Sequence, residues 1–199
     1  MEPSASALED GRSAMTVSRF EQEFFMLKLM LFRHAHADRP ADVDDHERPL
    51  SLRGHEEAQR MGAHIAAQGL APDLAVVSTA RRTQETWSRA SAAGGFAIPK
   101  VDESRIYESS AGDLLEVVRA QDPTHRSLML VGHNPGMERL TAWLMGSGDP
   151  QAVARLQREF VVAGLAVLEF DAESWAELDV QCGRLQRFDT PATVEGPAS

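Results

Sequence analysis

Arginine and histidine side chains stand at three separate places in this chain, each close behind a run of apolar residues. They are Arg33 with His34, Arg81 with Arg82, and His133. A guanidinium group presents a planar fork of donors that matches phosphate oxygens. A neutral imidazole can attack phosphorus as a nucleophile. One such pair could be a solvated strand end, but three at equivalent positions indicate a site for a phosphoryl group.

The three apolar runs are typical of buried parallel strands, which read as nearly continuous hydrophobic segments. They are residues 28–32, 74–78 and 127–131. Ligands of open α/β sheets bind at the carboxyl ends of the strands. A helix that begins near Ala80 would add free backbone N–H groups suited to an anion. Pro135 stands where another helix would begin. The pattern therefore predicts that the three polar sites converge.

The motifs around these residues resemble those of the histidine phosphatase superfamily, most closely its SixA-type phosphohistidine phosphatase branch. They are Arg33-His34-Ala35, Arg48-Pro49-Leu50 with Gly54, the segment from Ser78 to Thr86, and the unchanged Gly-His-Asn-Pro-Gly element at Gly132 to Gly136. The resemblance covers residues 28–191 approximately. The second motif departs from the family pattern at Thr79, Thr83 and Glu85. The alignment favours Arg82 as the second phosphate-binding arginine, with Arg81 as the alternative.

The resemblance implies a role for each site residue. His34 is the expected nucleophile, and Arg33, Arg82 and His133 are expected to bind the phosphoryl oxygens as three cationic groups. No metal and no cofactor is expected. Glu108 matches the family's proton donor, which protonates the leaving group and then activates water. The alternative is that Glu108 only begins a helix, where acidic residues suit the first turn. Asp38 and Asp113 are weaker candidates for the donor.

Two other kinds of protein would share some of these features. The spacing of His34, His36 and Asp38 is the His-x-His-x-Asp opening of a metal-ligand signature, and such ligands suit zinc or iron. However, Arg39 stands where that signature continues with histidine, and Arg33 would have no role. The second alternative is a non-catalytic phosphoprotein-binding domain that keeps the pocket without turnover.

Composition fits a soluble globular protein of 199 residues, of which 43% are hydrophobic and 25% charged. The net charge of −10 argues against a nucleic-acid partner. No run approaches the roughly 20 apolar residues that span a bilayer, so no membrane partner is expected. Cys182 is the single cysteine, which fits a cytoplasmic location. The oligomeric state is not indicated.

The expected fold is a three-layer α/β/α sandwich with a mostly parallel central sheet and an antiparallel edge. Residues 1–25 are expected to be a disordered or loosely packed extension, 26–191 the domain and 192–199 a flexible tail. Helices are expected at 51–68, 80–92, 109–120 and 135–145. A further strand is expected at 97–101, and an antiparallel edge pair at 164–170 and 175–181.

These features predict a metal-independent phosphatase that forms a phosphohistidine on His34. The interval between Gly94 and Ser127 leaves little chain for a helical lid, and an open site would admit a phosphorylated protein surface. The predicted substrate is therefore phosphohistidine on a signalling protein. A small phosphoester metabolite or a nucleotide is the alternative substrate.

Overall fold

The computed structural model describes residues 26–194. The extension expected at 1–25 and residues 195–199 of the expected tail lie outside the described residues. The strands are β1 (Met26–Arg33), β2 (Leu74–Val77), β3 (Lys100–Asp102), β4 (Ser127–Gly132), β5 (Met145–Gly148), β6 (Leu165–Asp171) and β7 (Gly183–Asp189). The helices are α2 (Leu52–Ala67), α3 (Arg81–Gly94), α4 (Ala111–Arg119), α5 (Gly136–Leu144) and α6 (Pro150–Arg158).

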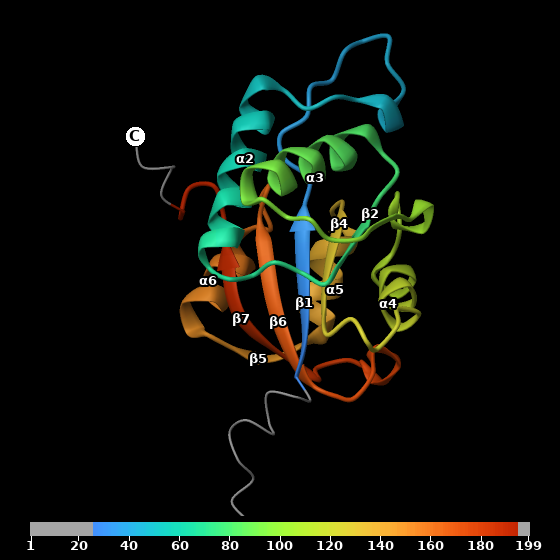
Figure 1. The fold of residues 1–199 in the computed structure, drawn as a ribbon, viewed down its shortest axis with the longest axis vertical. Helices are drawn as coiled ribbons and strands as arrows, with labels where there is room; N and C mark the ends of the chain where they lie inside the picture. The colour runs from blue at the N-terminus through green and yellow to red at the C-terminus, as the bar shows by residue number, and fades with distance from the viewer. Residues whose placement is uncertain (1–25, 195–199) are drawn as a thin grey trace, which may run out of the picture.

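The strands form one sheet in the order β3-β2-β4-β1-β6-β7-β5, with helices on both faces (Figure 1). All neighbouring strands pair in parallel except β6, which is antiparallel to both β1 and β7. Side chains of β1 alternate between the two cores. Leu29 and Leu31 pack in the core beneath α4, α5 and α6, whereas Met30 and Phe32 pack beneath α2 and α3. The predicted three-layer sandwich is confirmed.

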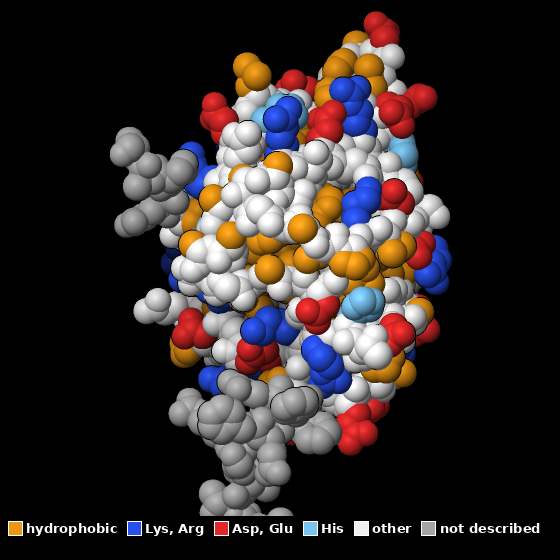
Figure 2. Space-filling view, in the orientation of Figure 1, with side chains coloured by type: hydrophobic (Ala, Val, Ile, Leu, Met, Phe, Trp, Pro, Cys, Tyr) orange, Lys and Arg blue, Asp and Glu red, His pale blue; other side chains and the backbone are white. Residues whose placement is uncertain are grey.

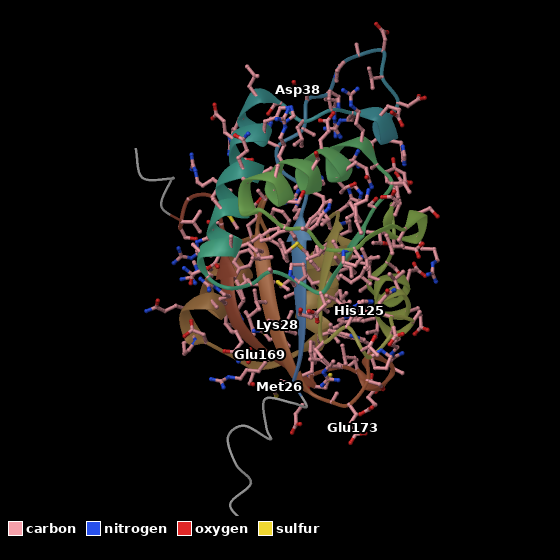
Figure 3. The ribbon with its side chains drawn as sticks, viewed as in Figure 1. Met26, Lys28, Asp38, His125, Glu169 and Glu173 are labelled. Carbon is pink, nitrogen blue, oxygen red and sulfur yellow. The ribbon has the colours of Figure 1, made fainter. Side chains whose placement is uncertain are left out.

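The central strands β2, β4 and β1 end at the same level of the sheet. Arg33 pairs with Gly132, and Val77 pairs with Val131. The next backbone groups continue this alignment, because the N–H of His34 donates to the Gly132 carbonyl at 3.0 Å. The residues after these strands therefore meet at one edge. Figure 3 shows Asp38 at this end of the molecule and Met26 at the opposite end.

The prediction of a strand at 175–181 is wrong. Trp175–Glu177 is a 3₁₀ turn, and Ser174 and Glu177 form a capping box at its start. Trp175 and Leu178 are both buried, and their spacing of three residues fits this turn. The antiparallel partner of β6 is β7, whose register shifts at Val167/Leu168.

Two further elements, a strand and a helix, were not predicted. β5 forms the edge beside β7, and α6 follows it with Asp149 as its N-cap. The strand expected at 97–101 corresponds to β3, which is shorter than expected and begins at Lys100. The other predicted helices agree with α2, α3, α4 and α5 within a few residues at their ends.

Gly54 allows α2 to approach the loop that follows β1. Ser51 caps the helix by accepting a hydrogen bond from the Gly54 N–H at 3.0 Å, and its own N–H donates to the His36 carbonyl at 3.0 Å. A Cβ at position 54 would collide with the carbonyl oxygen of His36. The close approach therefore requires glycine here and fixes the chain two residues after His34.

We expect Gly54→Ala to destabilise the protein by about 1–3 kcal/mol, because the added methyl group would push α2 away from the backbone at His36 in a packed region. Urea unfolding measures this change. The matched control is Gly112→Ala in α4, where the nearest atom to a new Cβ is Ser110 Oγ at 3.6 Å. Equal stability of the two variants would contradict the close approach of α2.

Acidic and basic side chains are interspersed over the face formed by α2 and α3 (Figure 2). Among residues 26–194, no helix combines the length and the apolar character needed to cross a membrane.

Candidate active site

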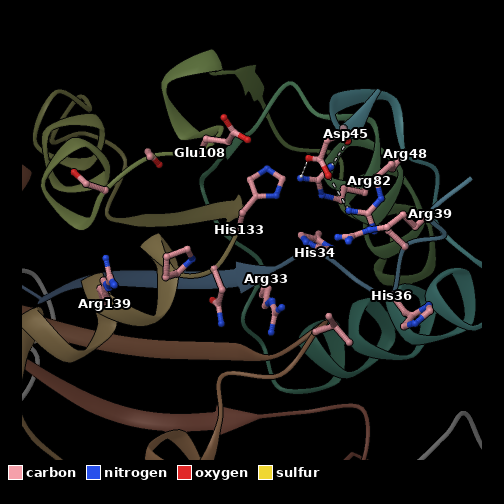
Figure 4. A pocket seen from close by; sticks show the side chains of 16 residues that line it. Arg33, His34, His36, Arg39, Asp45, Arg48, Arg82, Glu108, His133 and Arg139 are labelled. Atoms are coloured by element: carbon pink, nitrogen blue, oxygen red, sulfur yellow. Dashed lines mark hydrogen bonds and ion pairs between the residues drawn. The ribbon is translucent and has the colours of Figure 1, made fainter. Parts of the chain in front are cut away.

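A pocket of about 730 Å³ opens at the edge where β1, β2 and β4 end (Figure 4). Sixteen residues line it, and five of them are arginines. These are Arg33, Arg39, Arg48, Arg82 and Arg139. The pocket also contains His34, His36 and His133 beside two carboxylates, Asp45 and Glu108. All of the predicted site residues therefore line the same pocket.

His34 lies near the centre of this pocket, directly after β1. Its Nδ1 lies 2.8 Å from the carbonyl oxygen of Ala35. A carbonyl can only accept, so Nδ1 carries the proton and donates it to this oxygen. The lone pair is therefore on Nε2. Burial, reinforced by the positive charges of Arg82 and Arg33, lowers the pKa of His34 to about 4. At physiological pH the ring is therefore neutral and oriented, with the lone pair of Nε2 available for attack on phosphorus.

His133 stands beside His34, with ring centroids 5.2 Å apart. Its Nε2 lies 2.9 Å from Ser78 Oγ, the hydroxyl that follows β2. Burial and the neighbouring His34 and Arg82 lower the pKa of His133 to about 2. His133 is therefore neutral and not the cation expected from the sequence. If Ser78 donates to Nε2, the proton of His133 is on Nδ1 and can be donated to an oxyanion.

The structure distinguishes Arg82 from Arg81. The Arg82 side chain is 7% exposed and lines the pocket at the start of α3. Arg81 points outward, where its Nε donates to Glu85 Oε1 at 2.7 Å. Successive helical residues point about 100° apart, so only one of the two can face the sheet end. Arg82 is the one that does.

Asp45 is a pocket residue that the sequence did not single out. Arg82 donates to its carbonyl oxygen at 2.6 Å and to its carboxylate at 3.0 Å. Arg48 and Tyr107 donate to the same carboxylate at 2.9 Å each. The hydrogen bond from Arg48, with those from Tyr107 and Arg82, holds the pKa of Asp45 well below its usual range. This ionised carboxylate fixes the orientation of the Arg82 guanidinium group.

Arg33 is positioned from the other side of the pocket. Its Nη1 donates to the carbonyl oxygen of Phe160 at 2.6 Å, and Asn134 Nδ2 donates to the same oxygen at 3.0 Å. Burial lowers the pKa of Arg33, although Glu159 and Glu138 oppose this effect. The carbonyl contact fixes the guanidinium beside His34 without using all of its donors.

Four buried polar atoms of the pocket have no hydrogen-bond partner among residues 26–194. They are Arg33 Nε, Arg82 Nε, His133 Nδ1 and Asn134 Oδ1. Leaving a buried donor without a partner costs roughly 1–3 kcal/mol, so such atoms are uncommon and require an explanation. Arg33 Nε and Arg82 Nε are donors on residues predicted to bind phosphate, and His133 Nδ1 is a third donor when Ser78 donates to Nε2. All three side chains line the pocket together with His34, as expected of an anion-binding cavity.

Glu108 lines the pocket above His133 in Figure 4. Its backbone has φ of +51°, and α4 begins later, at Ala111 with Ser110 as its N-cap. Glu108 therefore does not begin a helix. The two weaker candidates for the proton donor do not line the pocket. Asp113 accepts hydrogen bonds from Ser110 in the capping box of α4, and Asp38 is exposed.

The residues of the metal-ligand alternative do not converge. His34 Nδ1 bonds to a backbone carbonyl, and His36 Nδ1 lies 2.8 Å from Ser51 Oγ. Over the described range 26–194, no group of three histidine, cysteine or acidic residues is arranged to hold a metal ion.

We expect the imidazole of His34 to titrate near pH 4, and to be neutral above that pH. Burial and nearby arginines disfavour the protonated form, so the pKa lies below the usual value of about 6.5. An NMR titration, with the His34 resonance assigned by its loss in His34→Gln, measures this pKa. Replacing Arg82 by alanine removes one positive charge and should raise it. Titration near pH 6.5 would contradict the buried, cation-flanked geometry.

Comparisons with known proteins identify the family of this chain. Residues 29–117 match the model of the histidine phosphatase superfamily, branch 1. An uncharacterized protein of Mycobacterium tuberculosis is 33% identical over 161 residues, which cover 80% of this chain and 99% of that protein. A crystal structure described as the "putative phosphohistidine phosphatase SixA" of Agrobacterium tumefaciens is 30% identical, with a TM-score of 0.70, covering 83% of this chain and 98% of that one. The similarly described protein of Nakamurella multipartitia is also 30% identical, with a TM-score of 0.70 and coverages of 87% and 98%.

Proposed function

The chain belongs to the histidine phosphatase superfamily, on its SixA-type branch, and we propose that it removes phosphate from phosphohistidine on a signalling protein through a covalent intermediate on His34. The observation that carries this proposal is the set of unpaired donors around a neutral, oriented imidazole. These groups supply a nucleophile and a binding site for phosphoryl oxygens from the chain's own residues.

The reaction proceeds in two displacements. Nε2 of His34 attacks phosphorus, the bond from phosphorus to the substrate's leaving nitrogen breaks, and the phosphoryl group becomes bound to Nε2. Water then attacks this phosphorus from the opposite side and releases inorganic phosphate, restoring His34. Arg33 and Arg82 bind the phosphoryl oxygens in both steps, and His133 donates from Nδ1. Preorganised donors of this kind stabilise the charge of the transition state without reorganising.

The position of Glu108 suits a proton donor to the leaving group and a base for the entering water. The need for such a donor depends on the substrate. An alkoxide is a poor leaving group, whereas an imidazole or a phenolate leaves more readily. Glu108 is therefore expected to matter least for phosphohistidine.

We expect Glu108→Gln to reduce kcat/KM for an alkyl phosphate by about 10²-fold, in the range typical of general acid–base catalysis. Hydrolysis of phosphohistidine should fall by less than about 5-fold. Steady-state rates on the two substrates measure this difference. An equal loss on both would assign Glu108 to binding rather than proton transfer.

The shape of the site supports a protein substrate. Between β3 and β4 the chain forms one short 3₁₀ turn and one α-helix, α4, whose residues Leu114, Leu115 and Val118 are buried in the core of the sandwich. It therefore packs against the sheet and is not a lid over the pocket. An open pocket can accept a side chain that projects from a folded domain.

The substrate proposal is tested by comparing kcat/KM for a phosphohistidine-containing protein, an aryl phosphate and a set of sugar phosphates, each with and without a chelator. We expect the phosphohistidine protein to be preferred and the chelator to have no effect. Turnover restricted to a sugar phosphate or a nucleotide would contradict the proposed substrate. Loss of activity on chelation would contradict the metal-independent mechanism.

A further inference from the structure

Two arginines of the pocket are not accounted for by phosphoryl transfer. Arg39 and Arg139 line the cavity, yet neither has a hydrogen bond or an ion pair with its guanidinium among residues 26–194. In contrast, Arg33, Arg48 and Arg82 are each anchored by a carbonyl or carboxylate oxygen. The two remaining guanidinium groups therefore keep all of their donors available for a ligand.

These two arginines lie on different sides of the nucleophile. Figure 4 shows Arg39 beside Arg48 to one side of His34, and Arg139 on α5 at the other end of the pocket. Arg139 is one helical turn after Pro135, which also lines the pocket. Arg39 also borders a neighbouring hollow of about 520 Å³, which is lined in part by Pro40, Ala41 and Val43. The cationic surface thus continues beyond the place where phosphorus must lie.

The size of the pocket exceeds the needs of a phosphoryl group. If each phosphate oxygen takes the volume of a liquid water, about 30 Å³, the group fills on the order of 100 Å³. The pocket measures about 730 Å³. Most of it is therefore available to parts of the substrate next to the phosphorus, and those parts face Arg39 and Arg139.

The carboxylates of the pocket do not neutralise these two arginines. Asp45 is already bonded to Arg48, Arg82 and Tyr107. Glu108 is the only other acidic residue of the lining. Five arginines against two carboxylates make the pocket positive, although the whole chain carries a net charge of −10. A local positive site on an acidic molecule attracts anionic groups to that site and repels them elsewhere.

We propose that Arg39 and Arg139 bind carboxylates that flank the phosphorylated residue of an acidic protein segment. This inference rests on the proposed function, because it takes phosphohistidine on a protein as the substrate. The two arginines select the segment around the phosphohistidine, whereas Arg33 and Arg82 bind the phosphoryl group that all substrates share. Selectivity among phosphoproteins follows from the sequence next to the phosphohistidine.

The test uses two phosphohistidine peptides, one with glutamate and one with glutamine on both sides of the phosphohistidine. The variants are Arg39→Gln, Arg139→Gln and the double variant. We expect the wild type to prefer the glutamate peptide by about 10-fold in kcat/KM. Each single variant should reduce this preference about 3-fold, the size of an exposed ion pair, and the double variant should abolish it. Raising NaCl to 0.5 M should also reduce it, because salt screens exposed charges.

Arg89→Gln is the matched control. Arg89 is an exposed residue of α3 that does not line the pocket, and its replacement changes the net charge equally. It should leave the preference unchanged. A similar effect of Arg89→Gln would show that overall charge, and not the two arginines, sets the preference, and would overturn the proposal. Equal hydrolysis of the two peptides by the wild type would also overturn it.

A second measurement separates this proposal from the proposed function. Unphosphorylated forms of the two peptides are tested as inhibitors of aryl phosphate hydrolysis. Stronger inhibition by the glutamate peptide that is lost in the double variant supports the carboxylate site, even if neither phosphohistidine peptide is hydrolysed. That result would contradict the proposed phosphohistidine substrate but not the carboxylate site. Equal inhibition by both peptides contradicts the carboxylate site whatever the substrate is.

Discussion

Replacing His34 by alanine is expected to lower kcat for aryl phosphate hydrolysis by at least about 10⁴-fold, since removal of a nucleophile abolishes the covalent route. The structure gives this residue the neutral form and the free Nε2 that attack requires. The donors of Arg33, Arg82 and His133 remain in the variant. It should therefore still bind inorganic phosphate within a few-fold of the wild type, which isothermal titration calorimetry measures.

His125→Ala is the control for this variant. His125 precedes β4, at the opposite end of the strand from His133, and does not line the pocket. Its replacement should leave kcat within about 2-fold. Thermal unfolding of both variants checks that the fold is intact. A folded His34→Ala protein that keeps a tenth of the wild-type activity would contradict the role of His34 as nucleophile. Turnover by the wild type that is lost in His34→Ala, with phosphate binding retained, would identify an enzyme, because a domain that only binds phosphoproteins has no turnover to lose.

The second large effect is expected for Arg82→Ala, which should lower kcat/KM by about 10²–10³-fold. This range is typical for the loss of one donor to a developing oxyanion. Arg82 supplies the buried, unpaired Nε and a positive charge close to His34. Steady-state kinetics with an aryl phosphate measure the loss. Arg81→Ala should remain within about 2-fold of the wild type, because Arg81 lies outside the pocket and pairs with Glu85.

Removing Arg82 also leaves the Asp45 carboxylate near the phosphoryl group with one fewer positive partner. The double variant Arg82→Ala, Asp45→Asn separates this repulsion from the loss of donors. We expect the double variant to recover part of the activity but to stay at least about 10-fold below the wild type. Full recovery would show that Arg82 only neutralises Asp45. Equal losses for Arg81→Ala and Arg82→Ala would contradict the assignment of the second phosphate-binding arginine.

The sequence allowed the predicted site residues to be placed in one pocket because several of them directly follow buried strands. Apolar runs identify such strands, and parallel strands that pair in register bring their ends together. The sequence alone could therefore place His34 and His133 at the same edge of the sheet, as the structure has them. The choice between Arg81 and Arg82 depended on the alignment of a motif with departures. Consecutive residues of a helix face different directions, and the structure shows that only Arg82 lines the pocket.

Two features could not be predicted, each for a physical reason. Trp175 and Leu178 read as a strand because both are apolar, but a spacing of three fits a 3₁₀ turn. The actual partner of β6 is β7, and the register shift between these two strands interrupts the alternation that marks a strand. Asp45 lies in a loop that also contains Asp42, Asp44 and Glu47. Composition marks the loop as acidic, and only the fold shows which carboxylate reaches Arg82.

The most direct measurement of the central claim is a rapid-quench experiment with a ³²P-labelled phosphohistidine protein. The label on the enzyme is mapped after quenching within the first turnover. We predict an alkali-stable, acid-labile phosphate on His34 that forms and decays at least as fast as kcat, and that is absent from His34→Ala. Turnover of the labelled substrate without any label on the enzyme, or with the label on another residue, would contradict nucleophilic attack by His34.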